Sequence, residues 1–187
     1  MRISNEFVVG TPLSTVWNFF QDVPSVAQCL PGAEVTEDKG GGVYRGKVSV
    51  KLGPLSAIFE GDATVTSDEA NRSAVIDGKG VDRRGGSRGQ VKVDYRLSEE
   101  GTGTKVSIDA DVVLAGAAAQ FGRTGLIAEM SNRLIGEFVS CLEAKLAATT
   151  AEEAAQIKAD EVKPLSLFFS SLVTWIGKLF RRWFGKR

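Results

Sequence analysis

The stretch VKVDYRLSEEGTGTKVSIDADVVL, residues 91–114, alternates apolar and polar side chains on either side of a short glycine-containing segment. Alternation places every second side chain on the same face of an extended strand. The segment EEGTG at residues 99–103 has the composition of a tight turn. The stretch therefore predicts an antiparallel β-hairpin with one continuous apolar face. That face consists of Val91, Val93, Tyr95, Leu97, Val106, Ile108, Ala110, Val112 and Leu114.

The residues that precede this hairpin repeat the alternation, and turn-forming segments separate the repeats. A meander of six antiparallel strands is therefore expected between residues 34 and 114. Residues 2–9 predict a seventh strand, and two short helical pieces are expected between residues 11 and 31, the first beginning at Thr11-Pro12. The expected turns are GGG at 40–42, LGP at 52–54, SDEANR at 67–72, RRGG at 83–86 and EEGTG at 99–103.

The apolar face of such a sheet must be covered, and residues 117–148 predict the cover. Their apolar residues recur every three or four positions, as in an amphipathic helix. We therefore expect an α+β fold in which a curved antiparallel seven-stranded sheet surrounds a long C-terminal helix. Glycines within the predicted strands favour a bent, open sheet, although a filled core with glycines at the bends remains an alternative. The helix residues are Phe121, Leu126, Ile127, Met130, Leu134, Ile135, Phe138, Val139, Leu142 and Leu146, and the strand glycines are Gly46, Gly61, Gly78, Gly80 and Gly89.

Composition excludes several classes of function. The 187 residues include no histidine and two cysteines, which argues against zinc sites, histidine bases and Ser/His or Cys/His nucleophile pairs. We expect no metal and no catalytic residues. Cys29 and Cys141 are expected to be buried reduced thiols, because the N-terminus has no signal-peptide pattern and the body is expected to be cytoplasmic.

Charge is distributed unevenly along the chain. Residues 1–162 carry 17 basic and 23 acidic residues, a net charge of −6, whereas residues 163–187 carry six basic residues and no acid. An acidic body with a basic end does not fit a nucleic-acid-binding protein. Residues 1–148 are expected to form the folded domain and 149–164 a spacer, which could instead continue the helix. The terminal segment 165–187 is expected to have a target of its own.

The terminal segment LSLFFSSLVTWIGKLFRRWFGKR, residues 165–187, predicts an amphipathic helix on a membrane surface. On a helical projection its large apolar residues occupy one half and its basic residues the other. A spanning helix is disfavoured because Lys178 would lie inside the bilayer, and docking onto a partner protein is the main alternative. The predicted membrane-binding residues are Phe168, Phe169, Leu172, Trp175, Ile176, Lys178, Leu179, Phe180, Arg181, Arg182 and Trp183.

Four segments in this order resemble the CoxG family of carbon monoxide dehydrogenase subunits, over roughly residues 1–148. They are LPGAE after the short helices, GPLSAIFEG on a middle strand, GKGVDRRGGSRG across a hairpin, and AAAQFGRTG before the long helix. The family belongs to the SRPBCC superfamily of START-like and Bet v 1-like helix-grip proteins. The resemblance implies a sheet that grips the helix around an apolar cavity. It also implies a tie to a molybdenum hydroxylase of the carbon monoxide dehydrogenase type.

These features together favour a binding protein over an enzyme. Electrons from such a dehydrogenase must reach a quinone in the bilayer, and a prenylated quinone does not leave hydrocarbon unaided. We therefore expect a peripheral protein at the cytoplasmic face of the cell membrane that holds a menaquinone-like quinone, its one expected cofactor, and delivers it to the dehydrogenase. A ligand-free membrane anchor or assembly factor is the alternative. The expected ligand-binding residues are Leu30, Val48, Val50, Phe59, Val93, Tyr95, Phe121, Leu126, Met130, Leu134 and Phe138.

The sequence disfavours an enzymatic role for its acids and nucleotide binding by its glycine-rich hairpin. An enzyme acting on a hydrophobic substrate would have to use acids such as Glu60, Asp77 or Asp82, which are more typical of solvated strand and turn positions. The hairpin GKGVDRRGGSRG is followed by an alternating strand, whereas a nucleotide-binding loop requires a helix there. Its arginines, Arg83, Arg84 and Arg88, are expected at a solvated hairpin tip, with docking to an acidic partner as the alternative.

Overall fold

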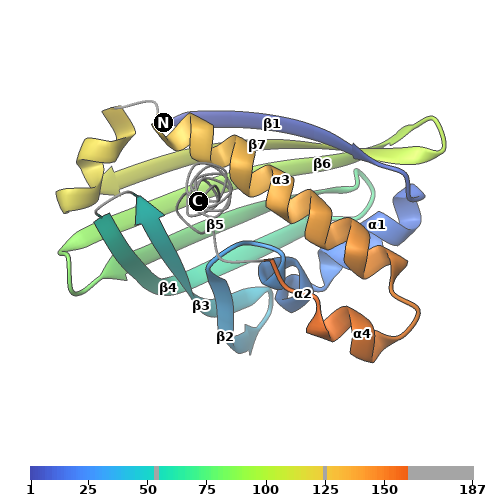
Figure 1. Ribbon diagram of the computed structural model, residues 1–187, viewed down its shortest axis with the longest axis horizontal. Coiled ribbons are helices and arrows are strands. Elements are labelled where there is room, and N and C mark those ends of the chain that lie inside the picture. The colour runs from blue at the N-terminus through green and yellow to red at the C-terminus, as the bar shows by residue number, and fades with distance from the viewer. Residues whose placement is uncertain (53–54, 124–125, 160–187) are drawn as a thin grey trace, which may run out of the picture.

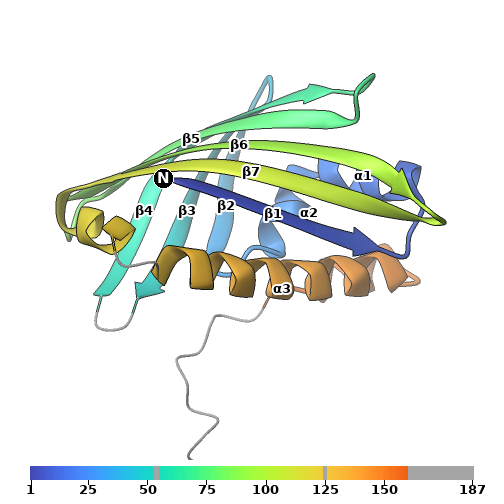
Figure 2. The same ribbon diagram turned by 90° about the horizontal axis from the view of Figure 1, so that it is seen from above.

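The computed structural model of the chain describes residues 1–52, 55–123 and 126–159, without the side chains of residues 51–55 and 121–130. Its seven strands form a single antiparallel sheet in the order β1-β7-β6-β5-β4-β3-β2, which curves around α3 (Figures 1 and 2). This is the curved sheet around a long helix that the strand alternation and the helical spacing predicted. The strands are β1 (Arg2–Val9), β2 (Ala33–Gly40), β3 (Val43–Leu52), β4 (Leu55–Asp68), β5 (Ser73–Asp82), β6 (Ser87–Glu100) and β7 (Gly103–Ala115). The helices are α1 (Leu13–Gln21), α2 (Val23–Gln28), the 3-10 helix η1 (Gly116–Arg123), α3 (Leu126–Ala147) and α4 (Ala151–Gln156).

The hairpin predicted from residues 91–114 is formed by β6 and β7. Its register pairs Val91 with Val112 and Leu97 with Val106, so the apolar residues of both strands share one face. The other strands of the meander also end at the predicted turn segments. This face is concave and is referred to below as the inner face; α3 lies against it (Figure 2).

The expected single helix over residues 117–148 is wrong in its first third. Residues Gly116–Arg123 form the 3-10 helix η1, and α3 begins only at Leu126. Gly116 has a φ of 74°, and Gly122 and Gly125 follow within ten residues. Each glycine costs about 1 kcal/mol in an α-helix, so the apolar spacing does not suffice to make this segment α-helical.

The expectation of reduced thiols is also wrong, because Cys29 and Cys141 form a disulfide. Their Cα atoms lie 5.3 Å apart although 112 residues separate them in sequence. Cys29 directly follows α2 and Cys141 lies in α3, and both side chains are buried. The bond therefore ties the short helices to the helix that the sheet grips.

A packed core fills one end of the molecule, where α1, α2 and the end of α3 meet the sheet (Figure 1). We refer to this as the α1 end, and to the opposite end, with η1 and the β5–β6 turn, as the η1 end. Three aromatic rings pack together in the core, with Phe20 5.1 Å from Tyr95 and 6.0 Å from Phe138 between ring centroids. The core cluster consists of Val9, Val16, Trp17, Phe20, Cys29, Ala74, Tyr95, Leu97, Val106, Phe138, Cys141 and Leu142.

The first part of the expected spacer packs onto this core. Ile157 and Ala159 contact the core cluster, and the backbone N–H of Ala159 donates to the carbonyl of Gln28 at 2.9 Å. The buried Lys145 of α3 donates from Nζ to Gln28 Oε1 and to the carbonyl oxygen of Ala154, both at 2.8 Å. The packed unit thus extends to Ala159 rather than ending at residue 148. In the described part of the chain, no helix combines the length and hydropathy needed to cross a bilayer.

Candidate functional site

A row of four glycines crosses the inner face near the η1 end. The register pairs Gly46 of β3 with Gly61 of β4, Gly61 with Gly80 of β5, and Gly80 with Gly89 of β6. Their neighbours along each strand alternate between the faces, which places all four on the inner face. The sheet therefore carries a strip without side chains across four adjacent strands, which we refer to as the glycine row.

Neighbouring backbones approach closely at the glycine row. A Cβ atom on Gly61 would overlap the carbonyl oxygen of Lys79 and would lie 2.8 Å from Gly80 Cα, and one on Gly46 would lie 2.6 Å from the carbonyl oxygen of Glu34. Only glycine permits such a close approach of neighbouring backbones. Figure 2 shows the result, with β3 and β4 turned steeply away from β6 and β7.

The side chain of Phe59 lies against two members of the glycine row, Gly80 and Gly89. Its Cβ is 3.2 Å from the position of a Cβ on Gly80, and its ring carbon Cδ1 is 3.5 Å from that of a Cβ on Gly89. Leu114 Cδ2 approaches Gly89 from the other side at 3.6 Å. The aromatic ring thus lies over the backbone of Gly89, with the Leu114 side chain nearby.

At the η1 end, the inner face is much less covered by other parts of the protein than at the α1 end. Phe59 and Leu114 are half-buried, and Val48 is 44% exposed, whereas Leu97 and Val106 at the α1 end are at most 3% exposed. An apolar surface of this kind suits a hydrophobic ligand. Other half-buried residues of this face are Val50, Val91, Val93 and Val112, and Leu134 of α3 is also half-buried.

The structure divides the expected ligand-binding residues into groups. Val50, Phe59, Val93 and Leu134 are half-buried, as residues lining a partly covered face would be. Tyr95 and Phe138 are 7% and 4% exposed and belong to the core cluster. Leu30 and Val48 are 41% and 44% exposed. The side chains of Phe121, Leu126 and Met130, and all of the predicted membrane-binding residues of segment 165–187, lie outside the described residues.

Leu114, Val91 and Val112 also belong to this site, although the sequence alone did not single them out as ligand-binding residues. All three lie in the quoted stretch and alternate with polar residues, so the periodicity assigned them to the correct face. Their place beside the glycine row depends on the register between strands, which the periodicity does not reveal.

Burial changes the pKa of Tyr95, an ionisable residue of the core cluster on this face. Desolvation raises the pKa of the Tyr95 hydroxyl to about 12, because an ionised phenol loses its hydration in an apolar surrounding. Tyr95 is therefore a neutral residue at physiological pH.

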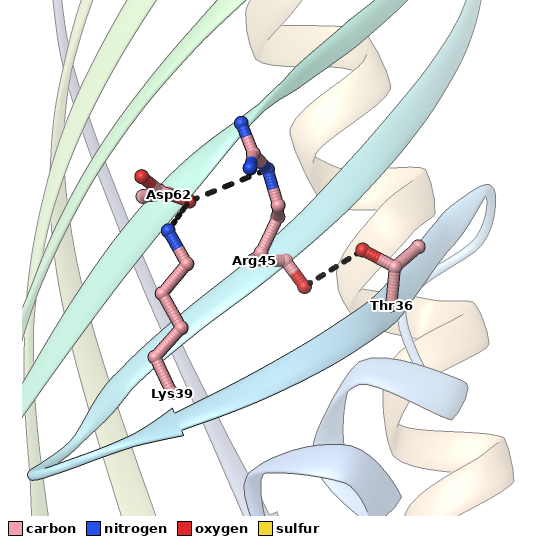
Figure 3. A network of polar contacts seen from close by, with 4 residues as sticks. All are labelled: Thr36, Lys39, Arg45 and Asp62. Carbon is pink, nitrogen blue, oxygen red and sulfur yellow. Dashed lines mark hydrogen bonds and ion pairs between the residues drawn. The ribbon is translucent and has the colours of Figure 1, made fainter.

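Charged side chains gather on the outer face instead. Asp62 accepts a hydrogen bond from Lys39 Nζ at 2.9 Å and lies 3.7 Å from Arg45 Nε, as Figure 3 shows together with the bond from Thr36 Oγ1 to the Arg45 carbonyl. The hydrogen bond from Lys39 keeps the pKa of Asp62 below its usual value. The two faces of the sheet thus differ in polarity, with ion pairs outside and aliphatic and aromatic groups inside.

The acids considered for catalysis do not converge. Glu60 and Asp77 are exposed on strand positions that alternate with the inner face. Asp82 is 5% exposed, and its carboxylate accepts the backbone N–H groups of Arg84 and Gly85 at 3.1 Å each, so it organises the β5–β6 turn. Within the described residues, no three His, Cys, Asp or Glu side chains are grouped so that they could hold a metal ion.

Comparison with solved structures shows the same fold at low sequence identity. A conserved protein from Geobacillus kaustophilus superposes with a TM-score of 0.68 and 15% identity, covering 79% of this chain and 95% of that one. The Zhui aromatase/cyclase from Streptomyces sp. R1128 gives 0.57 and 16%, covering 79% and 96%, and Ara h 8.0201 gives 0.51 and 13%, covering 78% and 97%. One of these neighbours is an enzyme, so the fold alone does not separate binding proteins from enzymes.

Comparison at the sequence level points to one family. No curated protein matches the chain. The model of the CoxG family of carbon monoxide dehydrogenase subunits matches residues 6–147, a span that runs from β1 to the end of α3 and includes the whole glycine row. The chain therefore belongs to the CoxG family of carbon monoxide dehydrogenase subunits.

Proposed function

We propose that the protein is a membrane-tethered carrier of a lipophilic quinone, menaquinone-like in chemistry, for a molybdenum-containing carbon monoxide dehydrogenase. The observation that carries the proposal is the contrast between the two ends of the inner face. The α1 end is filled by a packed core, whereas the η1 end presents half-buried aliphatic and aromatic groups over a strip of bare backbone. This arrangement leaves apolar surface for a ligand without loosening the core.

The physical requirements of quinone transfer support the proposal. A long prenyl chain gains about 0.8 kcal/mol for every CH₂ group that it buries, so a carrier must offer an apolar surface and must stand at the bilayer. The inner face is a candidate for the first requirement. Segment 165–187, with its apolar and basic halves, is a candidate for the second. The protein would then work at the cytoplasmic face of the cell membrane as a peripheral protein.

In this proposal the protein binds and orients the ligand and does not catalyse its reduction. The dehydrogenase supplies two electrons, and the quinone takes them up with two protons to become a quinol. Phe59 offers a ring that could stack on the flat quinone head, since aromatic groups favour offset stacking. The aliphatic residues Val50, Val93 and Leu134 would contact the prenyl chain.

The proposal can be tested by extracting the purified full-length protein and a variant lacking residues 165–187 with organic solvent, and identifying quinone by mass spectrometry. Both should contain stoichiometric quinone, and only the full-length protein should sediment with anionic vesicles. Val93→Lys and Leu134→Lys should lose the quinone while still folding, and Val8→Lys, at a position 52% exposed, is the matched control. A folded protein that stays empty after incubation with quinone would refute the carrier, and would favour the ligand-free membrane anchor instead.

A further inference from the structure

Exposed aliphatic side chains concentrate at the η1 end. Of the seven large hydrophobic residues that are exposed in the described part of the chain, five lie there, and three of these are outside the inner face. Val113 is 59% exposed and Met1 42%. Lone exposed apolar residues need no explanation, but a concentration at one end of a domain marks a contact surface. The three are Ile58, Val81 and Val113, whereas Met1 pairs with Val112 and lies with Val48 on the inner face.

Three arginines lie among these aliphatic groups. Arg83, Arg84 and Arg88 are all exposed, on the β5–β6 turn and at the start of β6. None of the ion pairs found among the described residues involves them. The nearest acid, Asp82, is buried and accepts backbone N–H groups rather than guanidinium groups. The turn therefore carries three guanidinium groups and one carboxylate, an excess of positive charge on a body whose net charge is −6 up to residue 162.

Two of these arginines line a depression. A hollow of about 280 Å³ lies at the turn, and it is lined by Val81, Asp82, Arg83, Gly86, Ser87 and Arg88. The Asp82 carboxylate accepts the backbone N–H groups of Arg84 and Gly85. The turn is held in place from behind, because the backbone N–H of Ala118 in η1 donates to Ser87 Oγ at 3.1 Å. Two guanidinium groups around one hollow, beside an aliphatic side chain, favour an oxyanion attached to an apolar body.

We propose that the η1 end is itself a membrane contact, in which Arg83 and Arg88 bind the phosphate groups of lipid headgroups and the exposed aliphatic residues reach the acyl boundary. The inference rests on the proposed function to the extent that segment 165–187 first brings the domain to the bilayer. The inference adds an orientation of the folded domain relative to the membrane. The partly covered half of the inner face would open toward the lipid, so that a quinone could pass between bilayer and protein without crossing water.

Other occupants fit this end less well. The chain's own terminal segment is repelled, since residues 163–187 carry six basic residues and no acid. A stable protein interface buries about 800 Å² on each partner and is anchored by aromatic residues, whereas the exposed apolar groups here are aliphatic. A lipid surface needs no such area, because contacts at the turn and at the terminal segment act on the same membrane and reinforce each other.

The test compares binding of the full-length protein to vesicles of phosphatidylcholine with and without phosphatidylglycerol. Each basic residue at an anionic surface contributes about 1 kcal/mol, or about fivefold in affinity. The variant R83Q/R84Q/R88Q should therefore bind anionic vesicles at least about tenfold more weakly than the wild type. The control K92Q/R96Q/K158Q removes the same charge at exposed positions outside the β5–β6 turn, and should change binding by less than about threefold. The variant R83K/R84K/R88K keeps the charge but loses the guanidinium geometry, and should bind more tightly than the glutamine variant.

Several results would overturn the inference. Wild-type affinity of the glutamine variant for anionic vesicles would do so, as would an equal loss in the control variant, which would indicate a general charge effect. Normal vesicle binding combined with loss of binding to the dehydrogenase would assign the turn to a protein partner. The quinone content of each variant is measured in parallel. A protein without quinone refutes the carrier and leaves the membrane contact standing, whereas failure of the contact leaves quinone content unchanged.

Discussion

The same substitution, glycine to alanine, should have opposite effects on stability at two members of the glycine row. A methyl group on Gly61 would overlap the Lys79 carbonyl oxygen and would lie 2.8 Å from Gly80 Cα. A methyl group on Gly89 would have its nearest neighbours at 3.5 and 3.6 Å, on Phe59 and Leu114, which are ordinary van der Waals distances. Gly61→Ala should therefore destabilise the protein, and Gly89→Ala should not.

The expected magnitudes follow from these contacts. Overpacking against structure that cannot yield costs about 1–3 kcal/mol, and opening the ladder between β4 and β5 loses hydrogen bonds worth about 1 kcal/mol each. We therefore expect Gly61→Ala to lower the free energy of unfolding by about 3 kcal/mol, which is a fall of roughly 6–12 °C in Tm for a domain of this size. Gly89→Ala should raise it by about 0.4–1 kcal/mol, because alanine restricts the unfolded chain.

Urea unfolding followed by far-ultraviolet circular dichroism would measure both values, with the wild type as reference. The two variants share the same chemical change, the same inner face and nearby places in the strand order, so a difference between them reports local backbone approach. If Gly61→Ala proved as stable as Gly89→Ala, the sheet would not be bent at the glycine row, and the η1 end would lose the feature that holds it open.

Three further outcomes are expected. Replacing Cys29 and Cys141 by alanine should lower the free energy of unfolding by roughly 2–5 kcal/mol, as for other disulfides that close long loops, and a non-reducing gel of the wild type would first show whether the bond is present. The pKa of Tyr95 is raised to about 12 from about 10 in the unfolded chain. The contribution of Tyr95 to stability should therefore be constant below pH 10 and should fall by up to about 1.4 kcal/mol per pH unit up to pH 12. Tyr95→Phe should remove this part of the slope in pH-dependent unfolding. Lys145→Ala should cost about 1–3 kcal/mol, because two acceptors lose their donor, and should speed amide exchange in α4; unchanged exchange would show that Lys145 does not hold α4.

Strand periodicity predicted most of the fold because it depends on local chemistry. In residues 91–114 every second side chain is apolar, and both the turn and the inner face followed from that pattern. The predicted start of the long helix was wrong at Gly116–Arg123, because the glycines of this region disfavour an α-helix despite the helical spacing of the apolar residues. The prediction of reduced thiols was wrong for a different reason, since no local property of Cys29 or Cys141 indicates that their backbones lie close together.

The candidate site was predictable only in part. Alternation assigned Phe59, Val93 and Leu114 to the inner face, yet it could not distinguish the packed α1 end from the less covered η1 end. It therefore could not show that Tyr95 and Phe138, both expected to contact ligand, would belong to the core cluster. Coverage depends on which strands lie under α1 and α2, and that is a property of the whole fold. The alignment of four glycines in one row likewise emerges only when four strands are set in register.

The pairing of the first strand with the last determines when this protein can fold during its synthesis. Arg2 pairs with Asp111, and the disulfide closes a segment of similar length. At roughly 5–20 residues per second, β1 must wait several seconds on the ribosome before β7 is made, and the core waits further for α3. Loops of this length slow the search for native contacts. We therefore expect folding to be largely post-translational, with the disulfide forming among the last steps, and chaperone binding to the nascent sheet to protect its unpaired edges.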